Sequence, residues 1–478
     1  MTDTELVRDG KEIRVALLHE DRLFPADERS RTIARRLYEG IKGLPILSPH
    51  GHTQARWFAI NEPFPDPVKL FVQPDHYVFR MLYSQGVTME ELEIGEDEIE
   101  EPREVWRIFA SHYHLFRGTP TRLWLDYAFQ ELFGMTERLC ERNAQRYYDT
   151  IAEKLQTPEF LPRTLYERFD IEVLATTDSP LEGLADHEAI RRSGWKARII
   201  PTFRPDSVVD PQHPGFLDNV RALGALTGDD TFTWRGYLRA LARRREYFKE
   251  MGCRATDHGH PTALTEDLSE TSAAALFEQV IKGTAYAADL EIFRGQMLTE
   301  MARMSLEDGL VMQIHPGSVR NHNAQLFARY GRDMGADIPA PTNYVEALRP
   351  LLNRFGNERN LTIILFTLDE TAYSRELAPL AGHYPCLKLG PPWWFNDSPE
   401  GMMRFREMAT ETAGFYNTVG FNDDTRAFLS IPARHDVARR IDAAFLGRMV
   451  AEHRLDEDEA VELAKDLTVG LVKKAYKL

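Results

Sequence analysis

The sequence has few cysteines, no long hydrophobic run and no recognisable export segment. Its three cysteines, Cys140, Cys253 and Cys386, are scattered and form no C-x-x-C pair, which argues against a disulfide framework or a zinc knuckle. The longest mainly apolar run, near Leu361–Leu368, is far shorter than the roughly 20 residues that span a bilayer. The charged segment Met1–Pro25 lacks the apolar core of a signal peptide. We therefore expect a soluble cytoplasmic protein with no membrane partner.

Basic residues are also fewer than acidic residues. The chain has 478 residues, with 58 Lys and Arg against 74 Asp and Glu, which gives a net charge of −16. This excess argues against a nucleic-acid partner, and an anionic substrate would need a local cluster of positive charge. The motifs G-x-G-x-x-G after a strand, the P-loop, H-E-x-x-H and G-x-S-x-G are absent, which lowers the dehydrogenase, kinase, zincin and serine-hydrolase interpretations. The composition leaves a homo-oligomer open.

What is present is a series of short apolar runs that alternate with longer helical stretches. Such alternation is typical of parallel βα units. Eight runs predict a closed (β/α)₈ barrel, an α/β fold, as one unit over residues 1–478. The runs are Leu44–Ser48, Ile171–Thr176, Ala197–Phe203, Cys253–Asp257, Leu310–Ile314, Leu361–Thr367, Cys386–Leu389 and Thr418–Phe421.

Two long segments do not fit a minimal barrel. About 120 residues separate the first two runs, far more than a βα crossover needs. Apolar residues in this segment recur at spacings of three and four, which predicts a helical insertion over residues 80–170. The C-terminal segment Ala433–Leu478 has the pattern of an amphipathic helix.

The ends of the first and last runs carry residues that could bind a metal. The first run ends in Pro49-His50-Gly51-His52, and residues i and i+2 of a strand share one face, so the two imidazoles can converge on an ion. By spacing alone, two solvent-facing histidines explain the motif equally well. Strands one and eight of a barrel are neighbours, which makes Asp423 or Asp424 a candidate third ligand or general base. A turn or a helix cap is the alternative for these aspartates.

Three other run ends carry histidine or arginine. His315 and Arg320 follow the fifth run, and Arg204 follows the third. An arginine can bind a carboxylate through two parallel hydrogen bonds, although each of these could equally lie on the surface. His258 and His260 form a second H-x-H motif that could compete as the metal site.

Aromatic residues complete the candidate set. Tyr77, in Asp75-His76-Tyr77, could shuttle a proton near a substrate, although an aromatic after a loop is more often a packing residue. Trp393 and Trp394 follow the seventh run and could wall a sugar pocket or simply plug the barrel mouth.

Together, these segments resemble the uronate isomerase (glucuronate isomerase) family, a divergent branch of the amidohydrolase superfamily. Their order and separation along nearly the whole chain make the resemblance specific. It rests on Leu47–His52, Asp75–Tyr77, Ala175–Asp178, Thr202–Asp206, Asp257–Gly259, His315 with Arg320, Gly390–Asp397 and Asp424–Arg426.

The resemblance implies a distorted barrel with a helical insertion after strand one. It implies one divalent metal, usually zinc, held by His50, His52 and Asp424. It also implies isomerisation of D-glucuronate to D-fructuronate and of D-galacturonate to D-tagaturonate. Asp424 would move the proton from C2 to C1, and Tyr77, supported by His76, would move a proton between O1 and O2. The residues expected to bind substrate are His315, Arg320, Trp393, Arg426 and Arg204.

Two other interpretations share some of these residues. A mononuclear metal-dependent hydrolase or decarboxylase of the same superfamily would have the same barrel and H-x-H motif. A non-catalytic protein that binds sugar acids would not require Asp424 and Tyr77 beside a metal. Formation of a ketose from a uronic acid would separate these interpretations.

Overall fold

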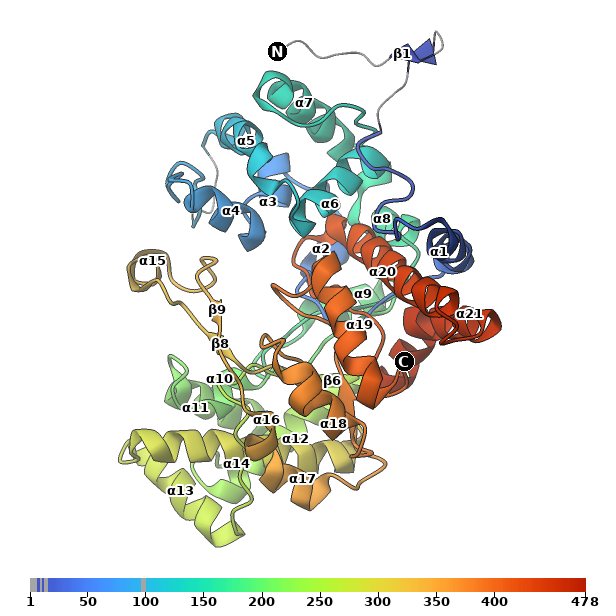
Figure 1. Ribbon diagram of the computed structural model, residues 1–478. Coiled ribbons are helices and arrows are strands. Elements are labelled where there is room, and N and C mark those ends of the chain that lie inside the picture. Colours follow the sequence, from blue (N-terminus) through green and yellow to red (C-terminus); the bar gives the residue numbers. More distant parts are fainter. Residues whose placement is uncertain (1–6, 9–10, 13–15, 96–99) are drawn as a thin grey trace.

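The computed structural model describes residues 7–8, 11–12, 16–95 and 100–478 (Figure 1). Part of the segment Met1–Pro25, on which the prediction of no export signal depends, lies outside the described residues. Within the described part of the chain, no helix combines the length and the apolar character needed to cross a membrane.

Parallel strands lie at the centre of the molecule. One sheet has the order β3-β4-β5 and a second has the order β11-β10-β7-β6. Every pairing in these two sheets is parallel. The strands are β3 (Ile46–Ser48), β4 (Ile171–Ala175), β5 (Ile199–Ile200), β6 (Ala255–His258), β7 (Val311–Ile314), β10 (Ile363–Leu365) and β11 (Leu387–Leu389). Two short antiparallel pairs lie outside them: β1 (Val7–Arg8) with β2 (Lys11–Glu12), and β8 (Ser318–Val319) with β9 (Ile338–Pro339).

Single bridges extend this parallel series. Phe203 bridges both Asp178 and Thr256, which connects the two sheets, and Thr418 bridges Leu389 beyond β11. At the far end of the series, the backbone N–H of His52 donates to the carbonyl of Thr425 over 3.0 Å. The segments after β3 and after Thr418 therefore meet.

Seven of the eight predicted strands form, and the eighth is reduced to the bridge at Thr418. Gly420 interrupts that segment because its φ of +79° is not an extended conformation. The third strand is also shorter than predicted, since Pro201 follows Ile200 and has no N–H for the ladder.

Alternate strand residues pack into two different cores. Leu47, Val173, Val311 and Ile364 join one cluster, which Tyr476 of the last helix also enters. Their neighbours in sequence, among them Met312 and the residues flanking Ile364, join a cluster with the surrounding helices. This division follows from the two-residue period of a strand, and it shows that both faces of the sheets are covered.

The segment between β3 and β4 is helical. Proline at the first turn of α3, α5, α6 and α8 suits a helix start, where its missing N–H costs no hydrogen bond. The elements are α2 (Ala55–Ile60), α3 (Pro67–Phe71), α4 (His76–Tyr83), α5 (Pro102–Ser111), η1 (Tyr113–Phe116), α6 (Pro120–Tyr127), η2 (Ala128–Leu132), η3 (Glu141–Asn143), α7 (Ala144–Leu155), η4 (Pro158–Phe160) and α8 (Pro162–Arg168).

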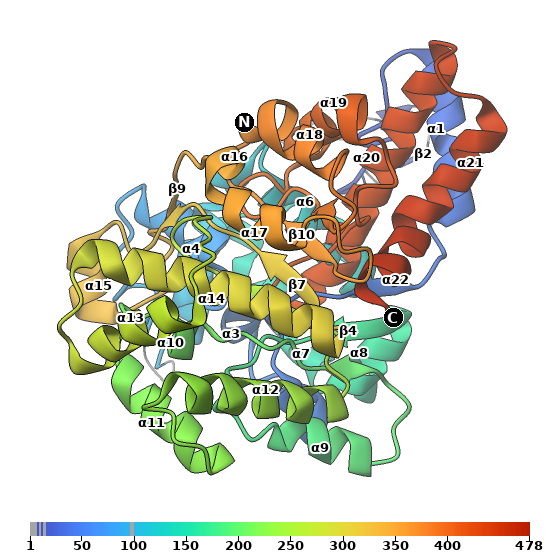
Figure 2. The same cartoon turned by 90° about the horizontal axis from the view of Figure 1, so that it is seen from below.

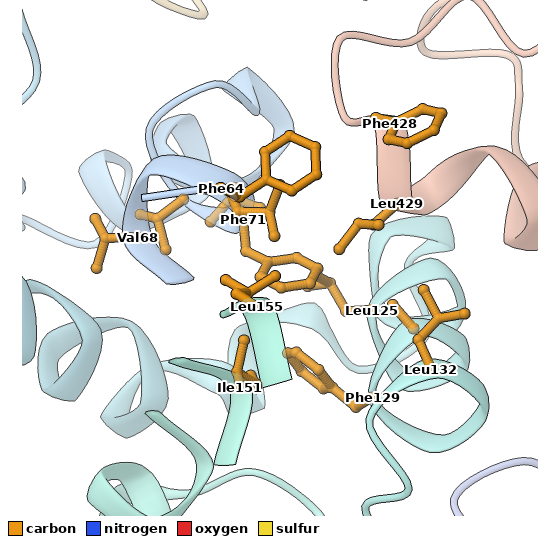
Figure 3. Close-up of a cluster of buried hydrophobic side chains, with 14 of the residues drawn as sticks. Phe64, Val68, Phe71, Leu125, Phe129, Leu132, Ile151, Leu155, Phe428 and Leu429 are labelled. Carbon is orange, nitrogen blue, oxygen red and sulfur yellow. The ribbon is translucent and has the colours of Figure 1, made fainter. Parts of the chain in front are cut away.

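These helices share one aromatic-rich core. Figure 3 shows Phe71 and Phe129 facing each other across the cluster, with Leu155 beside them. Phe428 and Leu429, from the distant segment after Thr418, pack in the same cluster. The helical segment is thereby fixed against the last part of the chain, which carries Asp424.

The remaining helices surround the strands. Figure 2 shows α14 running past β7, and this helix contacts that strand. The helices that follow β4 to β11 are α9 (Ala185–Arg192), α10 (Asp206–Val209), α11 (Phe216–Thr227), α12 (Trp234–Glu250), α13 (Glu270–Lys282), α14 (Ala287–Asp308), α15 (Ala324–Tyr330), α16 (Tyr344–Ala347), α17 (Arg349–Phe355), η5 (Tyr373–Leu377), α18 (Ala378–Ala381) and α19 (Pro399–Ala413).

The C-terminal segment forms several helices rather than one. They are η6 (Phe428–Ser430), α20 (Ile431–Ala451), α21 (Glu457–Lys465), η7 (Asp466–Gly470) and α22 (Leu471–Tyr476). The prediction of an amphipathic helix is wrong for α20, which is buried on nearly all sides because α1 (Glu28–Ile41), α19, α6 and α21 pack around it (Figure 2). Its buried arginines and aspartates are paired with one another or with neighbouring segments.

Candidate active site

A cavity of about 560 Å³ lies at the carboxyl ends of the strands. This is the end at which parallel α/β proteins place their functional loops. The ten residues that the family resemblance assigns to the site all line this one cavity: His50, His52, His76, Tyr77, Arg204, His315, Arg320, Trp393, Asp424 and Arg426. The structure therefore brings together residues that come from almost every part of the chain.

His50, His52 and Asp424 converge at the base of the cavity. Oδ1 of Asp424 lies 3.2 Å from Nε2 of His50 and 3.1 Å from Nε2 of His52. Neither contact has hydrogen-bond geometry, and this buried oxygen has no hydrogen-bond partner among the described residues. Three potential ligand atoms within 4.8 Å of one another, one of them an unsatisfied carboxylate oxygen, match the donor set of a divalent cation.

The local backbone makes this convergence possible. His50 and His52 follow β3 on the same side of the chain. A Cβ atom placed on Gly51, between them, would lie 3.5 Å from the carbonyl oxygen of Ala175. Asp424 has a φ of +42°, which is uncommon for a residue other than glycine. Burial would raise the pKa of Asp424, but the adjacent imidazoles hold it well below its ordinary value.

Asp423 has a different partner. Its Oδ2 lies 3.1 Å from Nε2 of His435 on α20, in hydrogen-bond geometry, and its side chain is buried. The sequence left open which of the two aspartates faces the histidines of strand one. The structure places Asp424 there and directs Asp423 toward α20.

Tyr77 and His76 lie in the first turn of α4. Asp75 caps this helix by accepting a hydrogen bond from the N–H of Tyr77 over 2.9 Å. The Tyr77 hydroxyl donates to Oδ1 of Asp397 over 2.9 Å and accepts from the N–H of Phe395 over 2.7 Å. Burial, together with the charge of Arg426, lowers the pKa of His76 to about 3, so this imidazole is neutral at pH 7.

Asp257, at the end of β6, connects His315 and Arg204. Nε2 of His315 lies 2.8 Å from Oδ1 of Asp257, and Nη1 of Arg204 lies 3.4 Å from Oδ2. Burial would raise the pKa of Asp257, but His315, His50 and Arg204 lower it far below its ordinary range. This carboxylate is therefore ionised and holds two of the predicted substrate-binding residues in place.

The predicted arginines each have an aspartate partner. Arg204 contacts Asp206 over 3.0 Å and Arg320 contacts Asp337 over 2.7 Å. Arg426 contacts Asp333 over 3.1 Å, and its side chain is the most exposed of the three. A guanidinium has five N–H donors, so each arginine keeps donors for an anionic ligand while the aspartate fixes its position.

Aromatic rings form one wall of the cavity. Trp393 lies against His315, with 4.8 Å between ring centroids, and Trp394 lies against His76, with 5.2 Å between centroids. The guanidinium of Arg320 lies 5.4 Å from the ring centroid of Trp394. The tryptophan pair thus lines the cavity and also contacts two histidines and an arginine.

Sequence reasoning missed several charged groups in the cavity wall, and two of them, Asp397 and Arg434, are paired with each other. In the sequence, Asp397 stands only as the last residue of the segment Gly390–Asp397, and no motif contains Arg434 of α20. They form an ion pair of 2.8 Å, and both also line the cavity. The one sequence signal for Arg434 is the density of charged residues in a helix that also carries many apolar ones, and this signal does not reveal which charges are buried.

The competing H-x-H motif forms a second cluster with Asp206. Ligand atoms of Asp206, His258 and His260 lie within 4.8 Å of one another. Asp206 accepts from Nε of Arg204 and from the N–H of Gly259, and Nε2 of His258 is 3.0 Å from the hydroxyl of Thr256. Of these three residues, Asp206 is the one recorded in the cavity lining.

A family profile and a similar known protein both point to the same family. A profile of the glucuronate isomerase family matches residues 24–476. The chain is 63% identical over 464 residues to a uronate isomerase of Phenylobacterium zucineum, which covers 96% of this chain and 97% of that protein.

Solved structures agree with this result. The crystal structure of glucuronate isomerase from Caulobacter crescentus superposes with a TM-score of 0.95 at 60% identity, covering 96% of this chain and 97% of that one. Uronate isomerase from Thermotoga maritima superposes with a TM-score of 0.90 at 31% identity, covering 96% and 99%. With a family profile over almost its full length and close relatives that match end to end, this chain belongs to the uronate isomerase family.

Proposed function

We propose that the protein isomerises D-glucuronate to D-fructuronate and D-galacturonate to D-tagaturonate through a cis-enediol. The observation that carries this proposal is the single cavity in which a buried carboxylate, a held phenol and several arginines face one another. An aldose-to-ketose conversion needs a base at C2, a group that exchanges protons with O1 and O2, and stabilisation of negative charge. The cavity offers a candidate for each role.

Asp424 is the proposed base. Its lowered pKa keeps the carboxylate ionised at neutral pH, which is the form that can accept a proton. Oδ1 faces His50 and His52, so we assign the C2 proton to Oδ2. The same oxygen would then return the proton to C1, which completes the change from aldose to ketose.

Tyr77 is the residue proposed to exchange protons with O1 and O2 of the substrate. Its pKa is raised well above the ordinary value by burial and by Asp397, so the phenol is protonated at pH 7. It would give its proton to O1 as Asp424 takes the C2 proton, and then take the proton of O2 as the C1–H bond forms. The neutral imidazole of His76, next to it on α4, supports the phenol without adding charge.

Arginine side chains are proposed to bind the anionic substrate. Arg320, Arg426 and Arg204 line the cavity and keep donors beyond their aspartate contacts. His315 and Trp393 lie side by side and would border the sugar chain. This local cluster explains how a chain with a net charge of −16 can take up an anion, because exposed charges elsewhere are screened beyond about 10 Å in 0.1 M salt.

The three converging ligands fit a metal ion. We propose one divalent cation, zinc, held by His50, His52 and Asp424, as the unsatisfied Oδ1 and the two neighbouring imidazoles suggest. Such an ion would polarise substrate oxygens and offset the negative charge that develops on them.

We also propose that the strand series closes into a distorted (β/α)₈ barrel, as one domain over residues 1–478 with residues 80–170 as a helical insertion. The continuous parallel series from β3 to Thr418 and the hydrogen bond between His52 and Thr425 support closure.

A cytoplasmic location is proposed because three free thiols stay reduced there. Self-association of the chain stays a prediction from the sequence.

The test of the activity is direct. The purified protein, loaded with Zn²⁺, is incubated with D-glucuronate and, separately, with D-galacturonate, and the products are identified by NMR. We expect the corresponding ketoses. Release of CO₂ or a hydrolysis product would favour the decarboxylase or hydrolase alternative, and binding without turnover would favour a sugar-acid binding protein.

Tyr77→Phe tests the proposed proton transfer. Removing the hydroxyl should lower kcat by about 10²- to 10⁴-fold, the usual contribution of a general acid or base, with little change in KM. The matched control is Tyr373→Phe, because Tyr373 is also buried but its hydroxyl has no partner among the described residues and lies outside the cavity lining. Steady-state kinetics that show full activity in Tyr77→Phe would remove Tyr77 from the mechanism.

A further inference from the structure

The hydroxyl of Tyr77 is held from two sides by groups outside its own helix. It donates to Oδ1 of Asp397 over 2.9 Å, and it accepts from the backbone N–H of Phe395 over 2.7 Å. A phenolic oxygen has one hydrogen and two lone pairs. With the hydrogen and one lone pair engaged, one lone pair is left for a ligand in the cavity that Tyr77 lines.

Asp397 is itself held by a second group. Its Oδ2 accepts from Nη1 of Arg434 over 2.8 Å. Arg434 also donates to the carbonyl of Asp423 over 3.3 Å and to the hydroxyl of Ser430 over 3.2 Å, and its guanidinium lies 3.6 Å from the ring centroid of Trp124. Through these contacts of Nη1, Nε and the guanidinium face, Arg434 connects the segment that carries Asp424 to the carboxylate that holds Tyr77.

Two features of this arrangement are costly for the fold. Phe395 has a φ of +65°, a conformation that bulky side chains rarely adopt, and it is the residue whose N–H reaches Tyr77. Asp397 and Arg434 are 8% and 4% exposed, and a buried ion pair often adds little net stability. Both features lie next to one hydroxyl, where strained backbone and buried charge are typical of functional sites.

We infer that Asp397, fixed by Arg434, is a positioning residue for Tyr77. It holds the hydroxyl hydrogen between turnovers and fixes the direction of the free lone pair. This inference rests on the proposed isomerase activity, in which Tyr77 exchanges protons with O1 and O2. The hydrogen turns from Asp397 to the substrate by rotation about the Cζ–O bond, while the N–H of Phe395 stays on the oxygen and stabilises the charge that develops there.

The charges around Tyr77 agree with this role. Burial and the carboxylate of Asp397 raise the pKa of Tyr77, and Arg434 opposes them. The other titratable groups that face it, Asp75, His76 and Arg80, lie on or next to its own helix. Without the charge of Asp397, the cation of Arg434 would act on Tyr77 with less opposition, and the phenol would lose its proton at a lower pH.

Asp397→Asn removes the charge with little change in shape. Arg434 can only donate, so the new amide oxygen should turn toward Arg434 and the amide NH₂ toward Tyr77. The Tyr77 hydrogen then loses its acceptor. We expect kcat to fall by roughly 10- to 100-fold, which corresponds to the loss of one hydrogen bond to a charged group, while KM and zinc content stay close to those of the wild type.

A double-mutant cycle decides whether Asp397 acts through Tyr77. If it does, Tyr77→Phe with Asp397→Asn is no slower than Tyr77→Phe alone. Effects on kcat that multiply would overturn the inference, as would wild-type kcat in Asp397→Asn. The matched control is Asp442→Asn, which unpairs another buried arginine, Arg406, and changes an aspartate on α20 away from the cavity. It should cost stability without the loss of kcat.

A second readout does not depend on turnover. The ¹³Cζ NMR signal of Tyr77, assigned by its absence from Tyr77→Phe, is followed against pH in the wild type and in Asp397→Asn. The inference predicts a lower pKa for Tyr77 in the variant, and an unchanged pKa would overturn it. If the wild type made no ketose, the proposed function would fail on its own, and this titration would still decide whether Asp397 controls the phenol.

Discussion

The two H-x-H motifs of this chain have nearly the same local sequence and very different surroundings. His50 and His52 follow β3, and His258 and His260 lie at and after the end of β6. Each pair has an aspartate close by. In the first cluster, the Oδ1 of Asp424 contacts both imidazoles and has no hydrogen-bond partner among the described residues.

In the second cluster, the carboxylate of Asp206 is already engaged, although both ring nitrogens of His260 have no hydrogen-bond partner among the described residues. Asp206 accepts hydrogen bonds from Arg204 and from the N–H of Gly259, and it lies 4.0 Å from Nε2 of His260. Burial lowers the pKa of His258 to about 3, so this imidazole is neutral at pH 7. A cation would have to share Asp206 with the guanidinium of Arg204. If His50, His52 and Asp424 hold the metal as proposed, the partner of the carboxylate, rather than the spacing of the histidines, is what distinguishes the two clusters.

The largest expected effect is on metal content, and it should distinguish the two H-x-H motifs. His52→Gln should lose zinc and lower kcat by more than about 100-fold, because it removes one of the three converging ligands. The matched change, His260→Gln, should keep both zinc content and kcat near those of the wild type. Metal analysis of the two purified variants checks this, and loss of zinc from His260→Gln would reverse the assignment.

A smaller effect is expected at the second aspartate. Asp206→Asn removes the charge that holds Arg204, so KM for the uronate should rise roughly 10-fold while kcat changes little. Zinc content should not change. Steady-state kinetics with metal analysis make the check, and a fall in kcat together with loss of zinc would show that the second cluster holds the catalytic ion.

The smallest expected effect is on how the free energy of unfolding depends on pH. The ordinary pKa of histidine is about 6.5, and that of folded His258 is lowered to about 3 by burial. As pH falls from 6.5 toward 3, the unfolded chain gains a proton that the folded chain does not, so the free energy of unfolding falls by about 1.4 kcal/mol per pH unit from this group. His258→Asn should make that fall shallower. Urea unfolding at pH 7 and pH 5 measures the difference, and identical slopes in the two proteins would contradict it.

The strands could be predicted from the sequence because each is a short apolar run that ends in a polar motif. The residues at those ends were predicted for the same reason, and those that the family resemblance assigned to the site meet in one cavity, whereas Asp423, His258 and His260 do not line it. The exceptions have local causes: Pro201 shortens the third strand, and Gly420 interrupts the eighth. Neither effect changes the order of the strands.

The partners of the site residues could not be predicted in this way. Asp423 and Asp424 are adjacent in sequence, and the positive φ of Asp424 decides which of them faces the histidines. Arg434 reaches Tyr77 only through Asp397, which comes from a different segment of the chain. The contacts of Arg434 form because α20 is buried on nearly all sides. They could not be predicted because the sequence pattern of α20 indicated a helix with an exposed face.

The most direct test of the central claim is isomerisation of D-glucuronate in D₂O, followed by NMR at C1 of the product. A carboxylate that has taken the C2 proton can exchange it with solvent before it delivers a hydrogen to C1. The account therefore predicts D-fructuronate that carries deuterium at C1 from the wild-type protein and no measurable ketose from Asp424→Asn. Ketose without deuterium at C1, formed equally well by Asp424→Asn, would contradict proton transfer by this residue.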